Sequence, residues 1–152
     1  MSGKHIVIVD DNKGIRESLE EFLYKLCKNS GIQMHVASEP RIAFEKIQKL
    51  KKNYQSDILL ITDLIFPQAS DDGLDLMMLV TEKYKNQRPF IVLLTAATDL
   101  ANERVKKAWD LADEVKIKSS GIFEVKIVVK NYFNCPEMDR LEKILPDYGR
   151  IN

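Results

Sequence analysis

The sequence predicts an α/β fold in which helices cover both faces of a doubly wound parallel sheet. Short apolar runs alternate with amphipathic helical stretches five times along the chain, which is the pattern of successive βα units. The first and third runs are almost entirely apolar, as strands buried on both faces should be. With 152 residues, the chain is long enough for one domain with a sizeable core.

The predicted elements follow in strict alternation. Strands are expected at Ile6–Val9, Gln33–Ala37, Ile58–Asp63, Phe90–Thr95 and Glu114–Ile117. Helices are expected around the apolar faces Ile15–Leu26, Ile42–Leu50, Leu74–Thr81, Leu100–Leu111 and Ile122–Phe133, whose residues recur at helical spacing.

Punctuating residues support these boundaries. Gly31 can end the first helix in a left-handed conformation, and Pro40 fits the first turn of the second. Ser119 and Ser120 are candidate caps for the fifth helix. We therefore assign residues 1–134 to one domain. Residues 135–152 form a C-terminal extension, with a short helix expected after Pro136 and a frayed tail.

Composition narrows the class of protein. Lys+Arg and Asp+Glu number 23 each, so the zero net charge argues against direct nucleic-acid binding. There is no signal core and no apolar run long enough to span a membrane, so a cytoplasmic protein without membrane contact is expected. Cys27 and Cys135 fit no metal or redox spacing and are expected to be reduced thiols.

Three carboxylates stand at predicted strand ends. Asp10 and Asp11 follow the first apolar run, and Asp63 ends the third. Because the carboxyl ends of parallel strands share one edge of a sheet, these acids are expected to converge. Clustered carboxylates resist ionising together unless a cation cancels their charge. Mg²⁺ or Mn²⁺ can do so, and Mg²⁺ typically joins one or two carboxylates to a phosphate oxygen.

Two further polar residues stand at neighbouring strand ends. Thr95 ends the fourth predicted strand, and Lys118 follows the fifth. Phosphoryl transfer to a carboxylate needs a nucleophilic acid, a bridging cation, and an ammonium and a hydroxyl that hold the remaining oxygens. The strand ends supply this set, so the sequence favours a metal-assisted phosphoryl acceptor.

These residues resemble the receiver domain of two-component response regulators, of the single-domain chemotaxis type or the sporulation-phosphorelay type. The resemblance runs from about His5 to Phe133 and rests on Val9–Asn12, Asp63–Pro67, Asp72-Gly73, Thr95-Ala96 and Lys118. It implies a flavodoxin-like (βα)5 domain with strand order 2-1-3-4-5. Asp63 then matches the phosphoacceptor, and Asp11 matches the acid that ligates Mg²⁺ directly. Asp10 matches the neighbour that acts through metal-bound water, and the backbone carbonyl of Ile65 matches the third protein ligand.

The resemblance also assigns the phosphoryl pocket. Thr95 matches the hydroxyl that turns toward the phosphoryl group, Lys118 the lysine that contacts it, and Ala96 the small residue that leaves it room. The family usually has a proline after this lysine, in a cis bond, where this chain has Ser119. An aromatic residue on the fifth strand is replaced by Val115.

A receiver of this kind would be regulatory rather than an enzyme. The resemblance implies that a sensor histidine kinase or a histidine phosphotransfer protein donates the phosphoryl group. The response would pass through the fourth helix, fifth strand and fifth helix to a downstream protein or a phosphorylation-dependent homodimer. Candidate residues of that face are Arg104, Lys107, Trp109 and Asp110.

Other functions share parts of this pattern. A non-phosphorylated, receiver-like interaction module is the alternative, although every acidic and phosphate-contacting residue is retained. A haloacid-dehalogenase-type phosphatase needs Asp-x-Asp after the first strand, where this chain has Asp10-Asp11-Asn12. A nucleotide-binding protein would need a glycine-rich phosphate loop there, and none follows the first strand.

Overall fold

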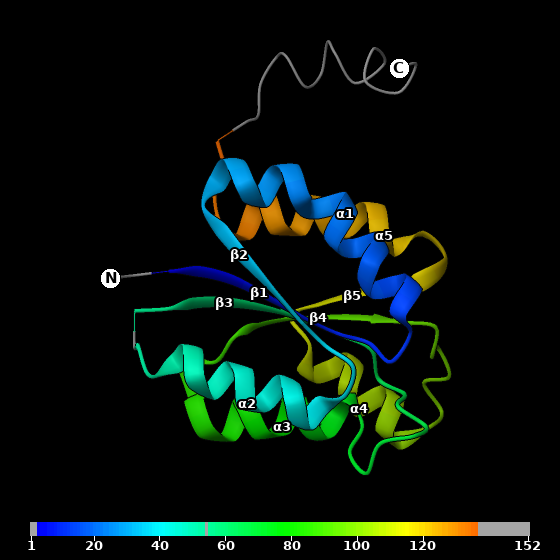
Figure 1. The fold of residues 1–152 in the computed structure, drawn as a ribbon. Coiled ribbons are helices and arrows are strands. Elements are labelled where there is room, and N and C mark those ends of the chain that lie inside the picture. The colour runs from blue at the N-terminus through cyan, green and yellow to red at the C-terminus, as the bar shows by residue number, and fades with distance from the viewer. Residues whose placement is uncertain (1–2, 54, 137–152) are drawn as a thin grey trace.

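The computed structural model describes residues 3–53 and 55–136, in which strands and helices alternate along the chain (Figure 1). The strands are β1 (Lys4–Val9), β2 (Ile32–Ala37), β3 (Asp57–Thr62), β4 (Phe90–Thr95) and β5 (Glu114–Ile117). The helices are α1 (Lys13–Ser30), α2 (Pro40–Lys51), α3 (Gly73–Tyr84), α4 (Glu103–Leu111) and α5 (Lys118–Tyr132), with the short 3₁₀ helix η1 (Lys85–Gln87). The helix predicted after Pro136 lies outside the described residues.

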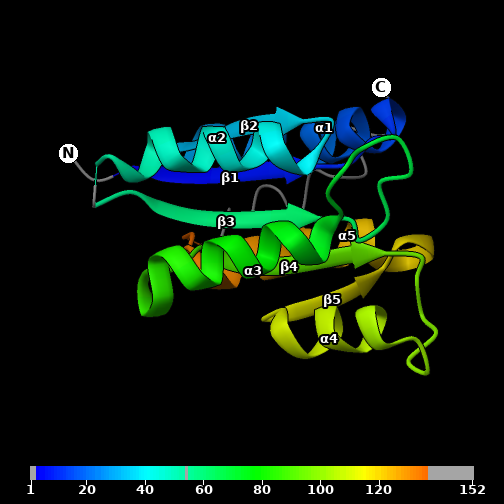
Figure 2. The same cartoon turned by 90° about the horizontal axis from the view of Figure 1, so that it is seen from below.

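The strands form one parallel sheet in the order β2-β1-β3-β4-β5, which confirms the predicted fold class. The arrowheads of the strands all point toward the same edge in Figure 2. The register pairs Val9 of β1 with Thr62 of β3, so the residues that follow them emerge side by side. The order reverses between β1 and β3, where sheets of this kind bind ligands.

Helices cover both faces of the sheet, α1 and α5 on one and α2, α3 and α4 on the other (Figure 1). Alternate residues of each buried strand therefore enter two separate cores. In β1, Val7 and Val9 pack with the second group of helices, and Ile6 and Ile8 pack with α1 and α5. All four side chains are buried, which explains why the strand is continuously apolar in sequence.

Two predicted boundary residues are confirmed and others differ: Asp63 lies just after β3 rather than in it, and Leu100 lies before α4. Gly31 ends α1 with a φ of 66°, and Pro40 is the first residue of α2. The prediction that Ser119 and Ser120 cap α5 is wrong, because α5 begins at Lys118 and both serines lie in its first turn. Ile117 is still extended, so β5 leads into the helix with no intervening loop. Among the residues described here, no helix combines the length and apolar character needed to cross a membrane.

Candidate functional site

The predicted acids meet at the carboxyl edge of the sheet. The Asp63 amide donates to the carbonyl of Val9 at 3.1 Å, which continues the pairing of β1 and β3 and aligns Asp63 with Asp10. One carboxylate oxygen from each of Asp10, Asp11 and Asp63 lies within 4.8 Å of the others. Asp10 and Asp63 are buried and Asp11 is exposed, so the cluster opens to solvent on the Asp11 side.

An ammonium group bridges the two buried acids. Lys118 Nζ lies 2.7 Å from Asp63 Oδ2 and 2.8 Å from Asp10 Oδ2. The lysine two residues earlier, Lys116, instead pairs with Glu124 of α5 at 3.5 Å. The peptide bond after Lys118 is trans, as are the others in the described residues, and Lys118 still reaches both carboxylates.

Burial and charge act in opposite directions on these groups. Burial raises the pKa of Asp10 above its ordinary value, although hydrogen bonds from Lys118 and the Asn12 amide act to lower it. Burial acts to lower the pKa of Lys118, but its hydrogen bonds to Asp10 and Asp63 outweigh this and raise the pKa overall. Lys118 is therefore an ammonium at neutral pH.

Backbone donors fix the remaining carboxylate oxygens. The Leu64 amide donates to Asp63 Oδ1 at 2.7 Å, and the Asn12 amide donates to Asp10 Oδ1 at 2.9 Å. Arg16 of α1 donates from Nη1 to the carbonyl oxygen of Asp10 at 2.7 Å. The two amide bonds hold the buried carboxylates in one orientation toward Lys118, and the arginine holds the backbone of Asp10.

This donor set fits a small divalent cation. Three ionised carboxylates and one ammonium leave two negative charges, which a dication can balance. Carboxylate oxygens are the ligands that Mg²⁺ and Mn²⁺ prefer. The exposed Asp11 offers a ligand oxygen on the solvent side of the cluster.

The other predicted site residues lie at or just after the carboxyl ends of β3 and β4. Thr95 is fully buried at the end of β4, and its Oγ1 accepts a hydrogen bond from the Ala97 amide at 3.0 Å. Ala96 follows it and is exposed. Ile65, two residues after Asp63, has half of its surface exposed. Thr95 is thus the last residue of its strand, whereas Ala96 and Ile65 lie in the segments that follow β4 and β3.

The structure adds two groups to which sequence reasoning assigned no role. Arg16 lies in the first turn of α1. A single arginine at this place gives no sign in the sequence that its side chain contacts Asp10, the residue after β1. Gly73 donates its amide to the Leu64 carbonyl at 2.8 Å, and a Cβ on Gly73 would lie 2.0 Å from the Asp63 carbonyl oxygen. The Asp72-Gly73 pair was visible in the sequence, but this close approach depends on how α3 packs.

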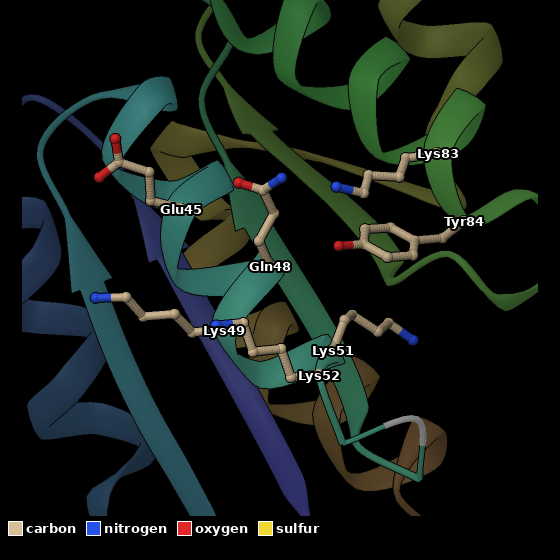
Figure 3. Close-up of a pocket in the computed structure, with 7 residues that line it drawn as sticks. All are labelled: Glu45, Gln48, Lys49, Lys51, Lys52, Lys83 and Tyr84. Atoms are coloured by element: carbon tan, nitrogen blue, oxygen red, sulfur yellow. The ribbon is translucent and has the colours of Figure 1, made fainter.

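A separate hollow of about 500 Å³ lies between the C-terminal ends of α2 and α3. Figure 3 shows Lys83 and Tyr84 of α3 facing Gln48 of α2 across it. Both helices run from the carboxyl edge of the sheet back to its amino edge, so this hollow and the acids lie at opposite edges. The helix dipole stabilises lysines at the C-terminal end of a helix, so the lysines around this hollow are explained without a ligand. The acid cluster therefore remains the candidate site.

The sequence and the fold can be compared with those of known proteins. No protein family and no curated protein matches the sequence. Many solved structures do match. The chemotaxis response regulator CheY4 of Vibrio cholerae is 20% identical, with a TM-score of 0.64 over 86% of this chain and 98% of that one. The chain has the fold of a response-regulator receiver domain.

Two other receivers show how fully this fold is shared. The signal receiver domain of a DNA-binding response regulator from Colwellia psychrerythraea is 17% identical, with a TM-score of 0.68 over 86% of this chain and 98% of that one. The response regulator Rcp1, solved with Mn²⁺ bound, is 19% identical, with a TM-score of 0.66 over 90% of this chain and 99% of that one. The receiver fold therefore accounts for nearly all of the described residues.

Proposed function

We propose that the protein is a receiver that accepts a phosphoryl group on Asp63 in a reaction that depends on Mg²⁺ or Mn²⁺. The observation that carries this proposal is the meeting of Asp10, Asp11 and Asp63 with the Lys118 ammonium at the carboxyl edge of the sheet. Structures with the same fold include a phosphorylated response regulator and one with Mn²⁺ bound, which supports the assignment.

The proposed reaction transfers the phosphoryl group from a phosphohistidine to a carboxylate. An oxygen of Asp63 attacks the phosphorus, and a P–O bond forms as the P–N bond breaks. The electron pair of the P–N bond stays on the imidazole nitrogen. Because the other ring nitrogen carries a proton, the leaving group is a neutral imidazole. The product on Asp63 is an acyl phosphate, which water later hydrolyses to restore the carboxylate.

The side chains contribute position and charge. Asp63 Oδ1 is held by the Leu64 amide, which fixes the plane of the attacking carboxylate. Lys118 already lies against Asp63 Oδ2 and is placed to contact a phosphoryl oxygen, and the Thr95 hydroxyl is assigned to another. The three acids and the Ile65 carbonyl would hold a divalent cation, which would neutralise charge on the transferred group.

We infer a regulatory role rather than turnover of a separate substrate. The proposed donor is a sensor histidine kinase or a histidine phosphotransfer protein. The proposed output runs through α4, β5 and α5 to a downstream protein or a phosphorylation-dependent homodimer. Lys107 and Asp110 are exposed on α4 and available to such a partner, whereas Trp109 is half-buried.

Intact-mass spectrometry tests this function directly. The protein is incubated with acetyl phosphate, with and without Mg²⁺, as the wild type, Asp63→Asn and Asp110→Asn. One phosphoryl adduct is expected in the wild type and in Asp110→Asn, whose altered carboxylate is an exposed partner of Lys106. No adduct is expected without Mg²⁺ or in Asp63→Asn. A folded wild type that gains no adduct would support a non-phosphorylated interaction module instead.

A further inference from the structure

One arginine ties α4 to the loop that follows Asp63. Arg104 donates from Nε to Asp72 Oδ2 at 2.9 Å and from Nη2 to Asp72 Oδ1 at 2.7 Å. The same Nη2 lies 3.1 Å from Asp75 Oδ1. Two parallel bonds to one carboxylate fix orientation as well as distance, which the single ammonium of a lysine cannot do.

The partner of this arginine is tied in turn to Asp63. Asp72 is the N-cap of α3: its Oδ1 accepts from the Asp75 amide at 2.9 Å, and its own amide donates to Asp75 Oδ2 at 2.9 Å. The next residue, Gly73, donates its amide to Leu64 and has its Cα packed against the Asp63 carbonyl. The start of α3 is therefore in direct contact with the backbone of Asp63 and Leu64.

The same helix reaches the Thr95 loop through a second residue. Trp109 Nε1 donates to the carbonyl oxygen of Ala97 at 3.1 Å, and the Ala97 amide donates to Thr95 Oγ1 at 3.0 Å. Thr95 is fully buried, so its hydroxyl has little room to turn while it accepts from the Ala97 amide. Thus α4 is hydrogen-bonded to the segments after both β3 and β4, on which the site is built.

We propose that Arg104 and Trp109 couple α4 to the state of Asp63, so that loading the acid site changes the environment of Trp109. The inference rests on the proposed phosphoacceptor function and specifies how a change leaves the site. A group on Asp63 that engages the Thr95 hydroxyl acts on Ala97 and then on Trp109. A shift of the Asp63 backbone acts through Gly73 and Asp72 on Arg104. Val115 leaves β5 without the aromatic side chain that the family resemblance associates with such coupling.

The chain contains one tryptophan, so fluorescence excited at a wavelength that tyrosine does not absorb reports on Trp109 alone. The protein is loaded with Mg²⁺ and beryllium trifluoride, a phosphoryl analogue, and in parallel with Mg²⁺ and acetyl phosphate, where mass spectrometry measures the loaded fraction. Loading is expected to shift the emission of the wild type. At equal loading, Arg104→Gln and Asp72→Asn are expected to lose most of the shift, although asparagine can still cap α3.

Two variants control for effects of charge and stability. Lys106→Gln removes an ion pair to Asp110 on the same helix and is expected to keep the full shift. Arg104→Lys keeps the charge without the paired bonds and is expected to retain only part of it. If Arg104 merely stabilises the fold, Arg104→Gln will unfold at lower urea yet keep the emission shift at equal loading.

The outcomes separate the two proposals. A wild type without a Mg²⁺-dependent adduct overturns the phosphoacceptor function and the coupling together. An adduct without a change in Trp109 emission overturns the coupling alone, as does a full emission shift in Arg104→Gln. An adduct with a shift that depends on Arg104 supports both.

Discussion

At the scale of single residues, the charge of Lys118 governs the acid cluster. Its ammonium lies within 2.8 Å of one oxygen of each buried carboxylate, and the same carboxylates would bind a metal ion. A lysine that balances the cluster therefore competes with a cation for the same oxygens. It is needed in the proposed reaction and opposes metal binding before that reaction begins.

Lys118→Gln should consequently bind Mg²⁺ more tightly and accept a phosphoryl group more slowly. Removal of one positive charge beside the acids is expected to raise the Mg²⁺ affinity about tenfold. Mg²⁺-dependent thermal stabilisation measures this affinity, because a ligand that binds only the folded state raises its stability by RT ln(1 + c/Kd), where c is the free ligand concentration. Lys116→Gln, which removes the partner of Glu124, is the matched control and should leave the affinity unchanged. Equal affinities in both variants would contradict the competition.

Gly73 shows how tightly the start of α3 is packed against the backbone of Asp63. Gly73→Ala places a Cβ 2.0 Å from the Asp63 carbonyl oxygen, so backbone must shift and the free energy of unfolding should fall by about 3 kcal/mol. Gly31→Ala is the control, because its added Cβ meets no atom within 4 Å and only the left-handed backbone is strained. That variant should lose about 1 kcal/mol. Urea unfolding followed by circular dichroism compares the two, and equal losses would contradict the close packing.

At the scale of single elements, α4 depends on its cap as well as on its packing. Asn102 Oδ1 accepts from the amides of Arg104 and Val105 at 3.0 and 3.2 Å. The helix has only nine residues; Val105 and Ala108 are buried, and Trp109 and Leu111 pack against the same core. The cap sets the first turn and with it the position of Arg104.

Asn102→Ala should reduce the free energy of unfolding by about 1 kcal/mol, because two helix amides lose their acceptor. Asn102→Asp keeps an acceptor at the cap and should retain most of the stability. Chemical denaturation of both variants provides the test. A loss of the same size in Asn102→Asp would show that the cap hydrogen bonds are not the cause.

The same scale shows what the sequence could and could not predict. Strands buried on both faces, such as Ile58–Ile61, are recognisable because burial makes them continuously apolar. The strand ends then place Asp10 and Asp63 at one edge. By contrast, the start of α5 at Lys118 carries no cap residue, and the Arg104 contact with Asp72 joins two helices whose relative position only tertiary packing determines.

At the scale of the whole molecule, the neighbouring strands β1 and β2 carry two histidines whose side chains are in contact. His5 Nδ1 lies 3.1 Å from His35 Nε2, and the register places these side chains on adjacent strands. Burial lowers the pKa of both histidines, and for His35 the proximity of His5 and Lys46 lowers it further. The folded protein therefore resists protonation that the unfolded chain accepts.

Stability should fall when the pH drops below the ordinary histidine pKa of 6.5. With a lowered pKa in the folded state, stability is complete above that value and declines below it until the folded histidines also titrate. Each excluded proton gives a slope of at most about 1.4 kcal/mol per pH unit. Urea unfolding between pH 7.5 and 5.5 measures the slope, and comparison with a histidine variant separates the contribution of this pair from that of Asp10, whose pKa burial raises. His35→Gln should flatten the slope; an unchanged slope would contradict the assignment.

The contact between Lys118 and Asp63 joins two distant parts of the chain. Lys118 and Asp63 are 55 residues apart in the sequence, yet one hydrogen bond of 2.7 Å joins them. That bond forms only after β1, β3, β4 and β5 have assembled in the correct register. A chain that has folded only its first half carries Asp63 without its ammonium. Phosphorylation would thus mark only completely folded molecules, and truncated or misfolded copies would stay silent in signalling.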